Sequence, residues 1–530
     1  MVAQSGSPSV AVVGAGPGGL ASAMLLAASG CRVDVYEAEP RVGGRTMRLT
    51  DHAPDGGAYH FDRGPTFFLM PFVLEEIFAA CGRRLSDYAE LTRLDPMYRL
   101  VMGRAGQEPV RLDCTQDVDL MAERIAAIEP ADAEGFRRIM RENRRKLEVF
   151  TPVLRKPFRS ALDLLDADMV RALPWLGPTK SVHGYLTSRL RSPYSRLAMS
   201  FQSKYLGMSP YTCPSLFSIL PFIEYEYGVW HPRGGCNALL TAMATALSEM
   251  GGRIHCGSPV ESIDFEGTRA TGVVVGGRRI AHDHVVLNAD APWALKNLVP
   301  AAMRPDWSDA RVDKARYSCS TYMLYLGLDR PVDLPHHTIY ISETYEQNLA
   351  DIEQGRITPD PSLYVCNPSA LDPTLAPRGH SALYVLVPTA NCRAGIEWSG
   401  QGGALRRRAL DRIASLAGFD IEPHIRTERR VTPDDWAASR IQFGATFNLA
   451  HNLGQMLHRR PRHELPGCQG VWLVGGGTHP GSGLPVIFLS AQITSRLLCE
   501  RAGLAWAGAT RGQRAAAPAG ATAEPVAALG

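Results

Sequence analysis

Hydrophobic positions near the start of the chain follow the pattern of a buried strand, a helix and a second strand. Residues 10–13 are a short β-branched apolar run, as in a parallel strand covered on both faces. Residues 21–29 are good helix formers, and Gly30 is placed to end that helix. Residues 32–36 alternate as a second strand, which closes at Glu37. Together these segments predict a complete βαβ unit.

The hydrophobic pattern changes after the βαβ unit. Over residues 67–230 the α/β rhythm gives way to helical patterns rich in arginine, leucine and aromatic residues. Helices are also predicted over residues 403–416 and from Pro485 onward, where proline suits a first helical position. Strands are predicted at residues 57–66, 253–257, 260–265, 271–275, 285–287, 321–328, 337–341, 363–366, 382–387 and 471–474.

Three glycines join the first strand to the first helix in the spacing GxGxxG. Gly14 permits a tight turn, Gly16 lets the backbone approach a pyrophosphate, and Gly19 lets helix and strand pack closely. The helix N-terminus offers free N–H groups to phosphates, and Glu37 is placed to accept hydrogen bonds from a ribose diol. A merely structural glycine turn is the alternative, which the ordered strand, helix, strand and acid disfavour.

A second glycine-rich turn follows the acid directly. Arg41, Gly43, Gly44 and Arg45 form an RxGGR sequence that brings further backbone and a cation toward the same pyrophosphate. This doublet resembles the flavoprotein version of the dinucleotide fingerprint more than the plain nicotinamide version. We therefore expect FAD as the cofactor.

Length, charge and cysteine usage exclude several classes of protein. A chain of 530 residues is long enough for two interleaved domains, and its net charge of +3 argues against nucleic acid as the main partner. No run of eighteen apolar residues predicts a membrane span. Residues 1–9 lack the pattern of a signal peptide, so we expect a cytoplasmic protein. Eleven scattered cysteines without a CxxC pair suggest neither a disulfide framework nor a metal site.

The predicted helix over residues 136–150 places five arginines and a lysine among its apolar positions. Basic residues continue to Arg159. One interpretation is an amphipathic lid that lies on an anionic bilayer, and the other is a solvated helix face with an ordinary core stripe. The pattern alone leaves both open.

Distinctive motifs extend along nearly the whole chain, namely VAVVGAGPGGLASAMLL with RVGGRT, FDRGPT, HPRGGCNALLTAM, VVLNADAPWAL, DPTLAPRGHSALYVLVP and VGGGTHPGSGLPVIFLSAQITSRLL. These motifs resemble those of the carotenoid phytoene desaturase family, the bacterial and fungal FAD-dependent type within the amine oxidase superfamily. The THPGSGLP form is similar to the branch acting on C30 substrates, the diapophytoene (dehydrosqualene) desaturases.

The resemblance implies an α/β fold: a discontinuous Rossmann-like FAD-binding domain, an interleaved mixed substrate domain and a helical lid. We expect the FAD-binding domain at residues 9–66, 230–295 and 465–502, the substrate domain at 67–229 and 296–464, a flexible N-terminus at 1–8 and a disordered tail at 503–530.

The resemblance also assigns cofactor-binding positions. Residues implied to hold the ADP half of FAD are Gly14, Gly16, Gly19, Glu37, Gly44 and Arg45. Val260 is implied to lie by the adenine, with Gly476, Gly477 and the helix start at Leu484 under the isoalloxazine. Arg63 departs from the small or hydroxyl residue expected at its position, which leaves open how that turn meets the flavin.

The implied reaction removes two hydrogens from adjacent carbons of a linear polyisoprenoid, phytoene or diapophytoene. The flavin takes a hydride, and a weak base suffices for the proton of the remaining allylic cation. The candidate bases or cation stabilisers are Asp62, Glu224, Glu226 and His479, and the sequence singles out none of them. The electrons then pass to oxygen or a quinone. A substrate dissolved in lipid favours the membrane interpretation, with the protein peripheral on the inner face.

Three alternative functions exist for this scaffold. A terminal-methyl oxidase or ketolase of the same family would add oxygen instead of removing hydrogen. An amine or porphyrinogen oxidase is disfavoured because DPTLAPRGH does not resemble those families. A flavin-free prenyl-lipid carrier is disfavoured by the intact glycines and by Glu37. The sequence leaves the substrate length and the oligomeric state open.

Overall fold

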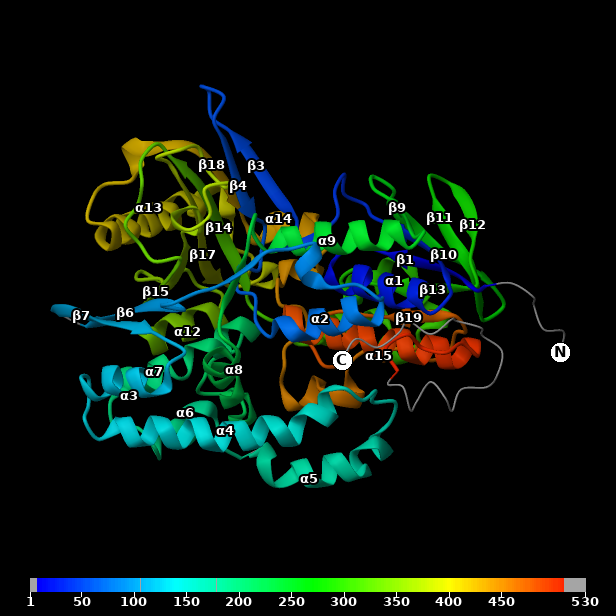
Figure 1. The fold of residues 1–530 in the computed structure, drawn as a ribbon, viewed down its shortest axis with the longest axis horizontal. Coiled ribbons are helices and arrows are strands. Elements are labelled where there is room, and N and C mark those ends of the chain that lie inside the picture. Colours follow the sequence, from blue (N-terminus) through cyan, green and yellow to red (C-terminus); the bar gives the residue numbers. More distant parts are fainter. Residues whose placement is uncertain (1–6, 105, 178, 510–530) are drawn as a thin grey trace.

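A computed structural model describes residues 7–104, 106–177 and 179–509. It has one lobe built on a parallel sheet and one on a larger mixed sheet, with a group of helices beneath the mixed sheet (Figure 1). The parallel sheet has the order β19-β13-β1-β2-β9. Its strands are β1 (Ser9–Val13), β2 (Arg32–Tyr36), β9 (Arg253–His255), β13 (His284–Leu287) and β19 (Val471–Leu473). The predicted α/β class and Rossmann-like unit are confirmed.

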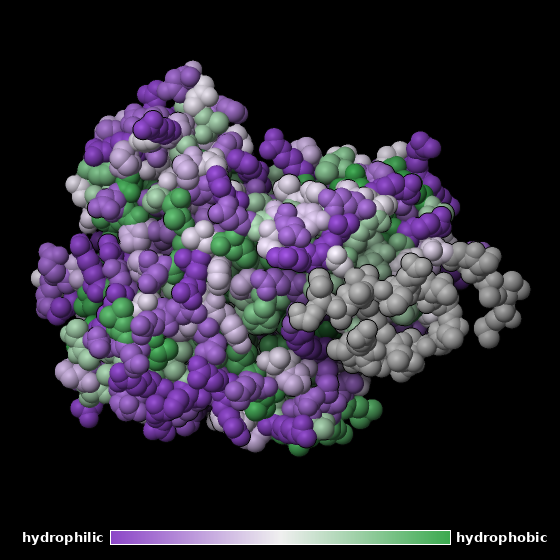
Figure 2. Space-filling view, viewed as in Figure 1, coloured by the Kyte–Doolittle hydropathy of each residue, from purple (hydrophilic) through white to green (hydrophobic). Residues whose placement is uncertain are grey.

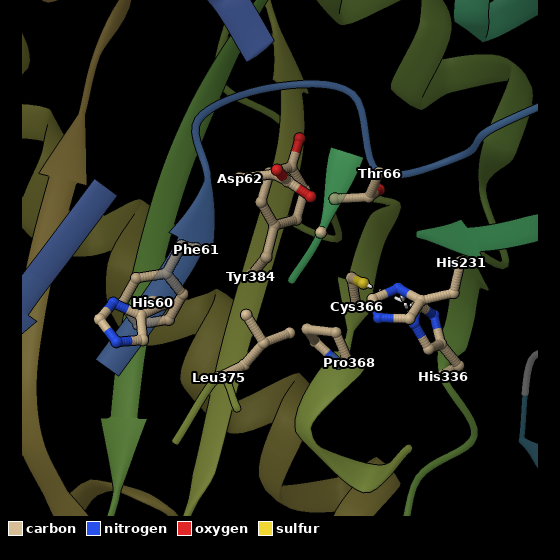
Figure 3. A pocket seen from close by; sticks show the side chains of 11 residues that line it. His60, Phe61, Asp62, Thr66, His231, His336, Cys366, Pro368, Leu375 and Tyr384 are labelled. Carbon is tan, nitrogen blue, oxygen red and sulfur yellow. Dashed lines mark hydrogen bonds between the residues drawn. The ribbon is translucent and has the colours of Figure 1, made fainter. Parts of the chain in front are cut away.

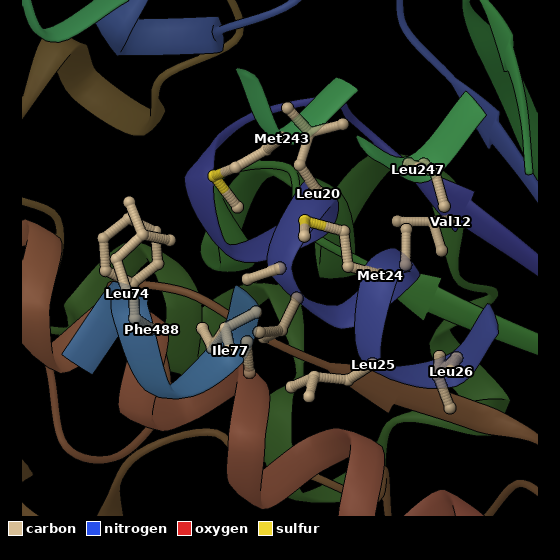
Figure 4. Close-up of a cluster of buried hydrophobic side chains, with 14 of the residues drawn as sticks. Val12, Leu20, Met24, Leu25, Leu26, Leu74, Ile77, Met243, Leu247 and Phe488 are labelled. Atoms are coloured by element: carbon tan, nitrogen blue, oxygen red, sulfur yellow. The ribbon is translucent and has the colours of Figure 1, made fainter. Parts of the chain in front are cut away.

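Both faces of the parallel sheet are covered, and three of its strands, β1, β13 and β19, are mainly apolar. One face packs on α1 (Pro17–Ala28), α2 (Pro71–Ala80), α9 (Cys236–Glu249) and α15 (Leu484–Ala502), whose apolar side chains form the cluster in Figure 4. Although α2 follows the first expected domain boundary, it belongs to this core. The other face packs on α10 (Ala291–Leu298) and a small antiparallel sheet of β10 (Val260–Glu266), β11 (Arg269–Val275) and β12 (Arg278–Ala281).

The mixed sheet has the order β18-β14-β17-β16-β15-β6-β7, and α13 (Trp398–Ala417) packs against it. Its strands are β6 (Tyr98–Arg104), β7 (Gln107–Cys114), β14 (Ser320–Leu328), β15 (His337–Ile341), β16 (Leu363–Cys366), β17 (Ser381–Thr389) and β18 (Ile425–Val431). The helical prediction for residues 67–230 is wrong for the β6–β7 hairpin. That hairpin joins the sheet because β6 pairs in parallel with β15, a contact between distant parts of the chain.

The lobe below consists mainly of short helices around the long helix α4. These helices are α3 (Val118–Ala126), α4 (Asp132–Leu154), α5 (Ala167–Leu176), α6 (Val182–Thr187), α7 (Pro193–Ala198) and α8 (Ile219–Tyr227). The remaining helices and strands are α11 (Asp309–Lys314), α12 (Tyr345–Glu353), α14 (Pro433–Ala438), β3 (Arg48–His52), β4 (Ala58–Asp62), β5 (Leu91–Arg93) and β8 (Trp230–Pro232). The predicted apolar stripe of α4 is buried, as at Phe136 and Leu147.

The predictions for the two ends fall largely outside the described residues, which exclude 1–6 and 510–530. For residues 503–509 the prediction of disorder is wrong. The Trp506 indole Nε1 donates to Ser495 Oγ at 3.0 Å, and the Ala507 amide donates to Ser29 Oγ at 2.9 Å. The segment is held because the Trp506 ring packs against the core under the parallel sheet.

Candidate functional site

A cavity of about 480 Å³ runs from the carboxyl ends of the parallel strands to the face of the mixed sheet. Ligands of open parallel sheets bind at this edge, where the strands end and the helices begin. Nine of the ten predicted cofactor residues line the cavity, namely Gly14, Gly16, Glu37, Gly44, Arg45, Val260, Gly476, Gly477 and Leu484. The structure therefore brings together segments from the beginning, middle and end of the chain.

The tenth residue, Gly19, lies behind the glycine loop. A Cβ atom at Gly19 would lie 2.1 Å from the carbonyl oxygen of Gly14, so only glycine fits at this crossing. The loop is also held by Asn288, whose side-chain amide donates to the Gly14 carbonyl at 3.1 Å. Sequence reasoning missed Asn288, although it directly follows strand β13. Its place beside the loop depends on the pairing of β13 with β1.

Glu37 is buried at the end of β2 and is fixed by backbone amides. Its Oε2 accepts from the Ala15 amide at 2.7 Å, and its Oε1 accepts from the Glu39 amide at 2.9 Å. Burial raises the pKa of this carboxyl, and the amide hydrogen bonds act in the opposite direction. The carboxylate thus braces the glycine loop at the cavity edge, and its contact with a ribose stays a prediction.

The second glycine turn touches the first. A Cβ atom at Gly44 would lie 3.5 Å from the Gly16 Cα, so the two turns form one continuous backbone surface. The Arg45 guanidinium donates to the Thr446 carbonyl at 2.7 Å and lines the cavity. A positive charge and two backbone turns at one place suit a pyrophosphate.

The glycine loop before α15 forms another part of the cavity wall. The N-terminus of α15 begins at Leu484, which lines the cavity, and its first turn leaves N–H groups without helical partners. Behind this loop, the buried Arg460 donates to the carbonyls of Gly476 at 3.0 Å and Leu449 at 3.1 Å. Burial lowers the pKa of Arg460 to about 10. This buried cation was missed because only the tertiary structure places it against the loop.

Arg63, the departure from the expected motif, is locked against the cavity wall. Its guanidinium lies 5.0 Å from the centroid of the Trp436 ring and donates to Ser439 Oγ at 2.5 Å. The Tyr325 hydroxyl donates to the Arg63 carbonyl. The turn therefore meets the cavity with a stacked cation, not with a small side chain.

None of the four candidate bases is among the described residues that line the large cavity. Asp62 caps α9: its carboxylate accepts from the amides of Cys236 and Asn237, each at 2.8 Å. Glu224 is fully buried and accepts from the Tyr98 hydroxyl at 2.8 Å. Both carboxylates hold neighbouring elements together.

The other two candidates lie in different places. Glu226 pairs with Arg144 at 2.6 Å on the helical lobe. The His479 Nε2 lies 3.2 Å from the Val153 carbonyl at the end of α4, and burial lowers the pKa of this histidine to about 4. The structure does not bring the four together, and their catalytic role stays a prediction.

Polar side chains that do line the cavity come from elements the sequence could not place together. Thr66 and Tyr364 face each other with their hydroxyl oxygens 2.6 Å apart. Lys204 also lines the cavity, and burial lowers the pKa of its amine. Beyond these groups the far part of the wall is mostly apolar, with Phe67, Leu69, Phe201, Met323, Ile339, Ile341, Leu363, Leu386, Ile441 and Phe447.

The basic surface of α4 differs from a free cationic stripe. Four of its arginines pair with acids, namely Arg137 with Asp119, Arg138 with Glu142, Arg141 with Glu134 and Arg144 with Glu226. Lys146 is buried, donates to Ser218 Oγ at 2.7 Å, and has its pKa lowered to about 8 by burial. These pairings weaken the expected attraction of this stretch to anionic lipid.

Exposed apolar side chains gather instead on the segment after α4. Leu162 and Leu165 are 75% and 74% exposed, and Val170 and Leu173 on α5 are each 51% exposed. Figure 2 shows hydrophobic surface at the lower edge of the molecule, where α5 lies in Figure 1. Among the described residues, no helix combines the length and apolar character that a membrane crossing requires.

Comparison with known proteins agrees with this geometry. Residues 17–499 match the model of the family described as flavin containing amine oxidoreductase. The chain belongs to this family. A flavin is therefore its cofactor, and the two touching glycine turns and the helix N-terminus form a fitting cradle for one.

Relatives within this amine oxidoreductase family include carotenoid enzymes. The chain is 40% identical to a 4,4'-diapophytoene desaturase (4,4'-diapolycopene-forming) of Methylomonas sp, over 93% of this chain and 95% of that protein. It is 39% identical to an all-trans-zeta-carotene desaturase of Myxococcus xanthus, over 93% of this chain and 94% of that one. Among solved structures, a putrescine oxidase variant aligns with a TM-score of 0.63 at 15% identity, over 94% of this chain and 99% of that chain. The last likeness supports the fold alone.

Proposed function

We propose that this chain is an FAD-dependent desaturase that introduces conjugated double bonds into a linear carotenoid precursor. One observation carries the proposal: the dinucleotide loop and a mostly apolar chamber belong to the same cavity. An apolar chain could be held there by burial alone, at roughly 0.8 kcal/mol for each methylene removed from water. The desaturase relatives support the same substrate class.

FAD is the flavin that the nucleotide-binding residues favour. The glycine loop, Arg45 and Glu37 would bind a pyrophosphate and a ribose, which FAD has and FMN lacks in this form. When bound, the flavin supplies a two-electron oxidant that accepts a hydride from carbon. The chain's own contribution is to hold the polyene against that oxidant, to exclude water with the aromatic and aliphatic wall, and to receive a proton.

The test is a product analysis in cells that supply either dehydrosqualene or phytoene. The expected result is a red-shifted pigment whose mass falls in steps of two hydrogens. Pigment from dehydrosqualene alone would assign a C30 substrate, and pigment from phytoene alone a C40 substrate. A product that gains oxygen from coloured carotenoids would indicate the terminal-methyl oxidase instead, and no change with any of these would refute the proposal.

We also propose that the enzyme binds peripherally to the inner face of the cell membrane, through the exposed apolar surface near α5. Leu162 and Leu165 supply most of this surface, and their exposure is otherwise unfavourable in water. A substrate that dissolves in lipid gives such a surface a purpose. Reduced enzyme would pass its electrons to oxygen or to a membrane quinone. Anaerobic turnover with an added quinone distinguishes these two acceptors.

A further inference from the structure

Three histidines and an aspartate form a buried row of side chains that begins at the cavity wall. The Tyr364 hydroxyl lies 2.6 Å from His337 Nδ1, and this nitrogen lies 3.4 Å from His336 Nδ1. The His336 Nε2 lies 3.0 Å from His231 Nδ1, and the His231 Nε2 lies 3.1 Å from an oxygen of Asp372. The row therefore links a cavity-lining hydroxyl to a buried carboxylate through neighbouring polar atoms that are at most 3.4 Å apart.

The three histidines and the aspartate come from three separate segments of the chain and are all shielded from solvent. His231 is 4% exposed, His336 8%, His337 0% and Asp372 3%. Figure 3 shows His231 and His336 side by side, with Cys366 next to them and Thr66 across a small pocket. That pocket has a volume of about 10 Å³, which is roughly the space of one water molecule. Burying three imidazoles in one row calls for a function beyond packing.

The row has room for one additional proton. Asp372 accepts from the Gly234 amide and from Thr374, and these bonds hold its pKa at about 2, although burial acts to raise it. If His231 donates to Asp372 and His336 donates to His231, two unprotonated Nδ1 atoms of His336 and His337 face each other. One additional proton can sit between these atoms.

A proton entering at Tyr364 can pass down the whole row. Tyr364 gives its hydroxyl proton to His337 as it receives one from the cavity, His337 passes a proton to His336, and His336 passes one to His231. His337 accepts and releases the proton at its Nδ1. His336 accepts a proton at Nδ1 and donates one from Nε2 to the Nδ1 of His231. The positive charge comes to rest on His231, beside the ionised Asp372.

We propose that Thr66, Tyr364, His337, His336, His231 and Asp372 form a relay that accepts the proton released during desaturation. This inference rests on the proposed function. In the proposed reaction, one substrate carbon would lose a hydride to the flavin, and a C–H bond of the neighbouring carbon would break. The electron pair of that bond becomes the new π bond, and its proton enters the row at the Thr66 and Tyr364 hydroxyls.

The first test breaks the row at two points, with the variants Tyr364→Phe and His336→Gln. Product formation in a single anaerobic turnover should be about 10²-fold slower in each. Because the links act in series, the double variant should be no slower than the slower single variant. Tyr322→Phe is the matched control, since this buried tyrosine donates to the Gly402 carbonyl away from the row and should keep the normal rate.

The second test does not depend on the rate. In the flavin-loaded enzyme with ¹⁵N-labelled histidine, the His231 ring should become an imidazolium after one anaerobic turnover, and it should stay neutral in Tyr364→Phe. Flavin content and thermal midpoint of each variant check that the fold is intact.

Three outcomes would overturn the relay while leaving desaturation in place: both single variants react at the normal rate, their losses multiply in the double variant, or the protein contains a stoichiometric metal that Cys366→Ser removes. The last outcome is included because ligand atoms of His336, His337 and Cys366 lie within 4.8 Å of one another. A flavin-loaded wild type that makes no product from either precursor would instead refute the proposed function itself.

Discussion

Replacing Leu162 and Leu165 by glutamine tests the proposed membrane-binding surface directly. Full burial of a leucine side chain is worth about 1.5–3 kcal/mol. Both side chains are about three-quarters exposed, so each can still contribute roughly 1–2 kcal/mol on entering lipid. The pair then contributes roughly 2–4 kcal/mol, which corresponds to a partition coefficient lowered about 30-fold to several hundred-fold in the double variant.

The assay is sedimentation of the purified protein with vesicles of neutral and of anionic lipid. Leu371→Gln is the matched control, because Leu371 is 45% exposed but follows β16, far from α5 in the chain. Since four arginines of α4 are already paired, neutral vesicles should retain most of the binding of anionic ones. Equal sedimentation of wild type and the double variant would refute the reasoning. A large dependence on anionic lipid would restore the basic stretch as the main contact.

Three further predictions concern the cofactor loop, a candidate base and acid stability. Gly19→Ala should yield colourless protein, because its Cβ would lie 2.1 Å from the Gly14 oxygen, whereas Gly403→Ala, with open space around it, should keep the flavin absorbance. Asp62→Ala should lower the free energy of unfolding by roughly 2–4 kcal/mol, because it removes the hydrogen-bond acceptor at the N-terminus of α9. The thermal midpoint should therefore fall, and a loss of activity with an unchanged midpoint would contradict this prediction. His479 has its pKa lowered from 6.5 to about 4, so the unfolded chain binds this proton more readily and stability should fall as the pH drops through that interval. In His479→Gln the denaturant midpoint should fall less steeply with decreasing pH than in the wild type. An equal pH dependence of the two midpoints would contradict this prediction.

The local pattern determined the nucleotide-binding half of this protein. The strand, glycine loop, helix and acid are adjacent in sequence, so their spacing predicts the βαβ unit and the cavity-lining Gly14, Gly16 and Glu37. The cavity-lining Val260, Gly476, Gly477 and Leu484 came from the family resemblance. Motifs spread along the chain identified the family, because each motif is itself a short local run of residues. Hydrophobic periodicity also gave α4 and its buried stripe, because a helix satisfies its backbone within one segment.

Only the tertiary structure decided which residues face the apolar part of the cavity. Asp62, Glu224 and His479 are polar residues near the expected motifs, but packing turned each toward a helix end, a tyrosine or a carbonyl. Tyr364 and His231 belong to one row because β16 pairs with β15, which carries His337, and because His336 contacts His231 on β8. Sheet pairing and side-chain packing join residues that are hundreds of positions apart, and no local pattern carries that information.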